Sequence, residues 1–150
     1  MTTDSVWLQR GTHRHRRVLL GGERCGIDAA IADAILRLNQ RGLTTVACCQ
    51  GDIRVGSREA LSIAYVKFAR RPKGFGIIAA VAEKAEMMVD RNAIHAHPAM
   101  CSDGKRVWQD REKQAHANRL FRRFLRDLSQ GELDTSAACY LLPANGLTPA

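Results

Sequence analysis

The sequence is poor in aromatic residues and has no long apolar run. Its 150 residues contain two tryptophans, two tyrosines and four phenylalanines. No segment approaches the roughly 18 uncharged apolar residues that a membrane span requires. The segment from Met1 to Arg17 also lacks the apolar centre of a secretory signal peptide. We therefore expect a cytoplasmic protein with no membrane partner.

The cysteines lack the pattern of a disulfide framework. Five are present, and two of them, Cys48 and Cys49, are adjacent. Frameworks normally use an even number of cysteines at spread positions. Neighbouring residues of a strand also point to opposite faces of the sheet. We expect free thiols, as is usual in a reducing compartment.

Acidic residues are outnumbered. The chain has 15 aspartates and glutamates against 23 lysines and arginines, which gives a formal net charge of +8. A surplus of this size favours polyanionic partners such as RNA, DNA or nucleotides. A solvated basic face without a partner is the alternative, because net charge informs about association and not about fold.

The pattern of apolar residues and turns predicts a single α+β domain over residues 1–150. Helices are expected at 28–41, 75–90 and 110–129, and strands at 43–49, 60–69, 92–100 and 106–109. Asp28 is the expected N-cap of the first helix. This αββ-αββ-α order predicts a mostly antiparallel sheet with helices largely on one face. Residues 1–9 and the tail at 131–150 are expected to be loosely ordered.

The end of the first predicted strand is the leading candidate site. Two thiols are followed there by an amide, a glycine and a carboxylate, and Gly51 permits a positive φ and a close approach to a ligand. Cys49 and Asp52 are candidate catalytic groups, although a buried cysteine also behaves as a small apolar residue. The candidate ligand-binding residues are Thr45, Cys48, Cys49, Gln50, Gly51 and Asp52.

This segment resembles part of the wybutosine-synthesis Tyw3 family, in which a helix precedes a Ser/Thr-rich segment ending in Ser-Cys-Ser-Gly. The residues that carry the resemblance are Leu38, Asn39, Gly42, Thr45, Cys49 and Gly51. Gln50 follows in register, and Cys48 stands where the family has a serine. The resemblance covers residues 28–69. The rest of the family signature is not evident, so it implies a site location and no catalytic residue.

The Tyw3 family is associated with S-adenosylmethionine-dependent methylation of a tRNA base. The resemblance therefore implies binding of RNA or a nucleotide. The chain also resembles short uncharacterised phage and bacterial proteins that have a Cys-Gln-Gly turn. The identity of any cofactor stays open at this stage.

A second group of residues has the spacing of metal ligands. His95 and His97 lie two residues apart, so on a strand they share a face, and Cys101 follows closely. A zinc site needs three or four ligands, and His116 is the candidate to complete it. Partly exposed strand histidines without a metal are the plainer interpretation.

Arginines supply the third candidate surface. Two clusters, one near the N-terminus and one on the last helix, are expected to bind phosphates. Their members are Arg14, Arg16, Arg17, Arg119, Arg122, Arg123 and Arg126. Tyr65 and Trp108 are candidate platforms for stacking of bases, with core packing as the alternative.

Three functions follow from these observations. The first is a small basic protein that binds nucleic acid or a nucleotide through the strand-end turn and the arginines. The second is a small enzyme, methyltransferase-like or thiol-dependent, that uses the same turn. The third is an accessory protein of phage type that binds a protein partner or a second copy of itself.

Overall fold

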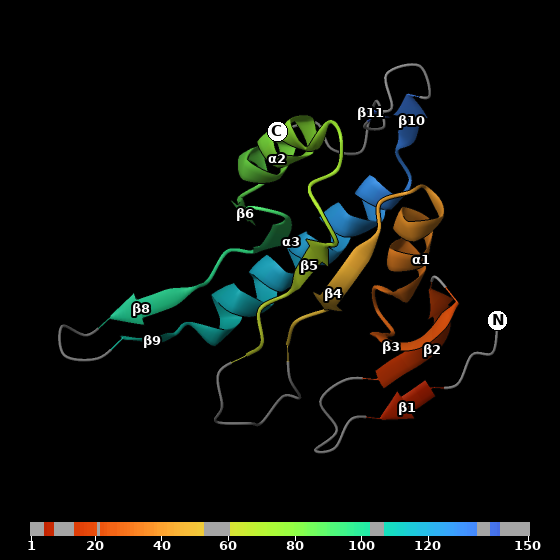
Figure 1. Cartoon of the computed structure of the whole chain (residues 1–150). Coiled ribbons are helices and arrows are strands. Elements are labelled where there is room, and N and C mark those ends of the chain that lie inside the picture. The colour runs from red at the N-terminus through yellow and green to blue at the C-terminus, as the bar shows by residue number, and fades with distance from the viewer. Residues whose placement is uncertain are drawn as a thin grey trace.

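The structure is a computed structural model that describes residues 5–7, 14–20, 22–52, 61–102, 107–134 and 139–141. These residues form an α+β fold with three helices and antiparallel strands (Figure 1). The predicted fold class is therefore confirmed. No helix among them is long and apolar enough to cross a bilayer.

A four-stranded antiparallel sheet carries the candidate site. Its strands are β4 (Thr45–Cys49), β5 (Tyr65–Phe68), β6 (Met87–Asp90) and β7 (Ala93–Ala96), in the spatial order β4-β5-β7-β6. Apolar residues alternate along β5 and β7, so that Val66, Phe68, Ile94 and Ala96 are fully buried. This alternation places one face of the sheet on the core.

The helices are α1 (Ala32–Gln40), α2 (Phe75–Lys84) and α3 (Arg111–Ser129). The last helix begins as predicted, and Asp110 is its N-cap, because its carboxylate accepts a hydrogen bond from Lys113 N at 3.1 Å. The apolar stripe of α3 is buried against the core at Phe121, Phe124, Leu125 and Leu128. In Figure 1, α1 lies beside the C-terminal half of α3, with which it is in contact.

A second sheet precedes α1. It consists of β1 (Ser5–Trp7), β2 (Arg14–Leu20) and β3 (Glu23–Asp28), with antiparallel pairing throughout. Val18 and Ile27 join the common core, and β3 contacts β4. The sequence analysis did not predict this sheet, because β2 consists of a basic run at 14–17 and three consecutive apolar residues, without the alternation typical of a strand.

Short hairpins complete the described chain. β8 (Met100–Ser102) pairs with β9 (Val107–Gln109), which confirms the strand predicted at 106–109, and β10 (Glu132–Asp134) pairs with β11 (Cys139–Leu141). Residues 53–60, residues 103–106 and the extreme ends of the chain lie outside the described residues.

Two predicted helix boundaries are wrong. Asp28 ends β3 and is not a helix cap, because its carboxylate accepts a hydrogen bond from Gln50 and pairs with His15; α1 begins at Ala32. The second helix ends at Lys84 and not at residue 90. Glu86 has a φ of 64°, which reverses the chain and lets residues 87–90 return as the edge strand β6.

Candidate nucleic-acid interface

The backbone after β4 has positive φ angles at two successive residues, the first of which must be glycine. Gly51 has a φ of 76° and Asp52 a φ of 63°. A Cβ atom on Gly51 would lie 2.6 Å from the side chain of Asn118 and 2.9 Å from the backbone nitrogen of Ala64. The backbone therefore approaches α3 more closely than any larger residue would allow.

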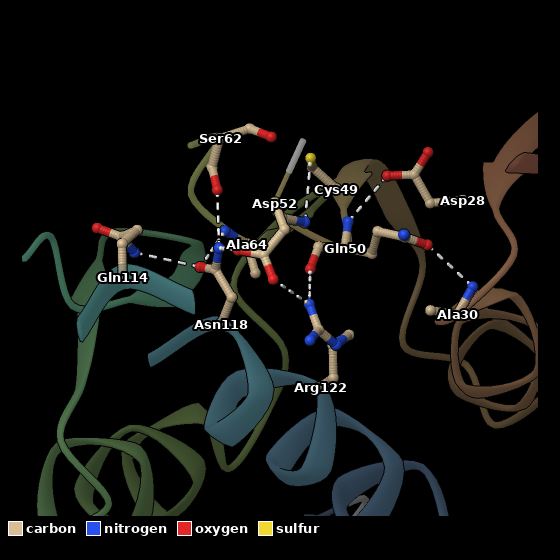
Figure 2. Close-up of polar contacts among 11 residues, drawn as sticks. Asp28, Ala30, Cys49, Gln50, Asp52, Ser62, Ala64, Gln114, Asn118 and Arg122 are labelled. Carbon is tan, nitrogen blue, oxygen red and sulfur yellow. Dashed lines mark hydrogen bonds and ion pairs between the residues drawn. The ribbon is translucent and has the colours of Figure 1, made fainter. Parts of the chain in front are cut away.

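Asn118 of α3 is the buried centre of the contacts that hold this turn (Figure 2). Its Nδ2 donates to Asp52 Oδ1 at 2.6 Å and to Ser62 O at 2.8 Å. Its Oδ1 accepts from Ala64 N at 3.0 Å and from Gln114 Nε2 at 3.2 Å. One amide thus connects the turn, the start of β5 and the helix.

Arg122, one turn of α3 further on, contacts the same turn from the other side. Its guanidinium donates to Gln50 O at 2.7 Å and lies 3.6 Å from Asp52 Oδ2. Its side chain is 23% exposed, so these contacts fix the position of a cation that still reaches solvent. The predicted turn and one of the predicted arginines therefore meet.

Asp28 fastens the turn to the N-terminal sheet. This carboxylate is 6% exposed; it accepts from Gln50 N at 2.9 Å and pairs with His15 Nε2 at 2.8 Å. The side chain of Gln50 also accepts a hydrogen bond from Ala30 N at 3.0 Å, just before α1. The backbone N–H and the side-chain oxygen of Gln50 are therefore occupied by the protein itself.

The two thiols of the turn are held in their neutral form. Burial, reinforced by the charge of Asp28, raises the pKa of Cys48 to about 12. Burial is also the main cause that raises the pKa of Cys49, opposed in part by the backbone N–H of Gly51. A nucleophilic cysteine needs a lowered pKa, so this arrangement does not favour thiol chemistry.

Thr45 lies apart from the turn. It occupies the first position of β4, about 13 Å along the strand from Cys49. Its hydroxyl accepts from Asn39 Nδ2 at 3.0 Å, and its backbone N–H donates to Asn39 Oδ1 at 3.1 Å. These contacts join α1 to β4, so the structure gives Thr45 a role in local packing.

An arginine-rich groove lies beside the turn, between α1 and α3. Its volume is about 470 Å³. Four of its arginines come from α3 with spacings of three, one and three residues, which places them on one helical face. The charged residues that line it are Asp33, Arg37, Arg119, Arg122, Arg123 and Arg126. We call this feature the arginine groove.

Asp33 is the acidic residue among the described residues that line the arginine groove. Its Oδ1 lies 2.7 Å from Arg16 Nη1, so the charge of Asp33 is offset by an arginine from β2. The predicted Arg16 therefore reaches the edge of the groove. Arg17 is exposed and follows Arg16 along the strand, so it points to the opposite face. The side chain of Arg14 lies outside the described residues.

Among the described side chains, two of the predicted metal ligands, His97 and His116, share a hollow. His95 lies on β7, whereas His97 is exposed beyond the end of this strand and lines a second hollow of about 750 Å³ with His116. Among the residues that the structure describes, no group of three histidine, cysteine or acidic side chains is placed to hold a metal ion. The side chain of Cys101 lies outside this part of the chain.

Sequence reasoning missed three residues of this region. Arg37 adds a cation from α1, and Gln114 and Asn118 supply the buried amides. The burial of the two amides could have been predicted from the sequence, because positions 114 and 118 continue the buried stripe of Phe121 and Leu125 toward the start of the helix. A polar residue in an apolar stripe indicates a buried hydrogen-bond network.

Comparison with models of protein families, with curated proteins and with solved structures finds no match to this chain.

Proposed function

We propose that this protein binds nucleic acid or nucleotides through the arginine groove, with the phosphates as the main points of contact. The observation that carries the proposal is the concentration of charge. Five arginines line one groove, and Asp33, the acidic residue among the described residues that line it with them, is paired with Arg16. Such a cluster attracts phosphates and releases their counterions.

The spacing along α3 fits a short length of one strand. From Arg119 to Arg126 the helix rises about 10 Å. Successive phosphates of one strand of a duplex are about 3.4 Å apart along its axis, so this row spans about three of them. Guanidinium groups also bind phosphate oxygens in pairs, which favours arginine over lysine here.

The turn supports the groove by positioning Arg122. Gln50 O accepts from the guanidinium, and Asp52 is held beside it by Asn118. A cation that is already oriented loses less freedom when a ligand binds. The resemblance to the Tyw3 family points to the same class of ligand, since it implies RNA or nucleotide binding at this turn.

Fluorescence anisotropy tests the proposal. Labelled 12-nucleotide single strands of RNA and DNA, and a labelled mononucleotide, are titrated with the whole protein at several salt concentrations. We expect the logarithm of the binding constant of the strands to fall with the logarithm of salt with a slope of about −2 to −3, as for three or four phosphate contacts. An absence of binding at low salt would contradict the proposal.

A charge-matched pair of variants locates the site. Replacing Arg123 and Arg126 by glutamine removes two exposed cations from the groove, and we expect about tenfold weaker binding and a shallower salt slope. Replacing Arg24 and Lys84 by glutamine removes two exposed cations that do not line the groove. Equal losses in both variants would show that binding follows net charge and not the groove.

A further inference from the structure

The four-stranded sheet has a second face, turned away from the buried side chains of Val66 and Ile94. Because side chains alternate along each strand, residues 65, 67, 88 and 95 lie on this second face. Tyr65 is 36% exposed and Met88 39% exposed, and Lys67 is exposed beside them. Solvent therefore reaches this surface, which we call the open sheet face.

The strand register arranges these side chains in a row. Cys49 pairs with Tyr65, Tyr65 pairs with His95, and His95 pairs with Met88. Side chains that are directly opposite in an antiparallel sheet have Cβ atoms about 5 Å apart. Two ring side chains thus lie next to each other on this face, Tyr65 exposed and His95 half-buried, with a polarizable methionine at one end of the row.

The neighbouring row of paired residues contains an exposed cation, Lys67. Ala47, Lys67 and Ala93 are paired in register, and Asp90 pairs with Ala93 at the sheet edge. Two alanines flank Lys67, so its ammonium group is accessible. Lys67 lies about 7 Å along β5 from Tyr65 on the same face.

We infer that the open sheet face stacks the bases of a single-stranded nucleic acid on Tyr65 and His95, with Lys67 contacting the adjacent phosphate. This inference rests on the proposed function and names the form of its ligand. Exposed rings beside a cation suit an unpaired base, which offers a flat face and a phosphate. The bases of a duplex are stacked on one another and cannot lie on such a surface.

One further observation agrees with this assignment. The row ends at Cys49, and the next residue, Gln50, accepts the hydrogen bond from Arg122. The end of β4 therefore connects the open sheet face with the arginine groove.

The test uses a 12-nucleotide RNA strand that contains the fluorescent base 2-aminopurine, whose emission falls when the base stacks. The wild-type protein is expected to quench this emission and to bind the strand more tightly than the corresponding duplex. Tyr65→Ala is expected to weaken binding about tenfold and to abolish the quenching, with an unchanged salt slope because no charge is removed. Tyr65→Phe is expected to restore both, because the ring is kept.

The outcomes separate this inference from the proposed function. Salt-sensitive binding that depends on Arg123 and Arg126, together with full affinity and quenching in Tyr65→Ala, would overturn the inference alone. An absence of strand binding by the wild-type protein would overturn both. If alanine lowers the melting temperature, Tyr65→Leu provides an apolar side chain without a ring, and the same loss of quenching is expected.

Discussion

Asn118 and Asp52 are 66 residues apart in the sequence, yet the amide nitrogen of Asn118 donates to the carboxylate of Asp52 at 2.6 Å. This contact ties the turn after β4 to the middle of α3. The carboxylate also faces Arg122, so the hydrogen bond orients a charged group of the arginine groove. The core network and the proposed interface are therefore mechanically linked.

Replacing Asn118 by alanine should destabilise the protein strongly. The change leaves the buried Ala64 N–H and the carbonyl of Ser62 without their amide partner. Each buried polar group left unpaired costs about 1–3 kcal/mol, so we expect the free energy of unfolding to fall by about 3 kcal/mol. Urea denaturation measures it. His116→Ala, an exposed change on the same helix, is the control, and an equal effect there would contradict the role given to Asn118.

Replacing Gly51 by alanine tests the close approach of the turn to α3. Both Gly51 and Gly42 have positive φ angles, of 76° and 86°, but a Cβ atom on Gly42 would meet nothing within 4 Å. Gly42→Ala should therefore cost about 1 kcal/mol from backbone strain alone. Gly51→Ala adds the clash with Asn118 and should cost at least about 2 kcal/mol more. Similar melting temperatures for the two variants would show that the turn can move away from the helix.

The sequence predicted elements best where one physical signal dominated. The apolar stripe of α3 defined the last helix, and Gly51 marked the turn. The prediction of Asp28 as the N-cap of the first helix was wrong, because its carboxylate instead accepts a hydrogen bond from Gln50 and pairs with His15. Local pattern cannot distinguish a helix cap from a long-range acceptor.

The sequence predicted individual residues of the candidate site, but not how the fold brings them together. The arginines of α3 are visible as a helical stripe, but nothing local indicates that Arg37 of α1 faces them across a groove. The pairing of Tyr65 with His95 depends on strand order and register, which are set by packing of the whole sheet. The two adjacent cysteines suggested a catalytic thiol, but burial raises their pKa values and so does not favour a nucleophile.

The raised pKa of Cys48 predicts a loss of stability in alkali. The folded value is about 12 against an ordinary value of 9.0, so between these pH values the folded state holds a proton that the unfolded state releases. Stability from this group is complete below about pH 9 and declines as the pH rises toward 12, by up to about 1.4 kcal/mol per pH unit.

Cys48→Ala should remove this part of the pH dependence. Melting temperatures of the wild-type protein and the variant, measured at pH 7, 9 and 10.5, are compared. The variant is expected to start lower, because a buried side chain is truncated, and to lose less stability above pH 9. Parallel curves over the whole range would contradict burial of a neutral thiol at this position.

Asp33→Asn should strengthen binding of nucleic acid. The change removes the acidic charge among the described lining residues of the arginine groove, and it releases Arg16 from its ion pair. A nearby charge at this exposed position is worth less than about 1 kcal/mol, so we expect about threefold tighter binding of a 12-nucleotide strand at 50 mM salt. The gain should shrink at 300 mM salt, because exposed charges are screened.

Glu83→Gln is the matched control for this gain, since it removes one negative charge from an exposed position of α2 that does not line the arginine groove. Anisotropy titrations of both variants are compared at the two salt concentrations. Asp33→Asn also loses a favourable charge in the first turn of α1, so its melting temperature should fall slightly while its affinity rises. Asp33 stabilises the fold but repels the ligand, so its replacement should change stability and affinity in opposite directions. Equally tighter binding in both variants would show that net charge attracts the ligand and that the arginine groove is not its site.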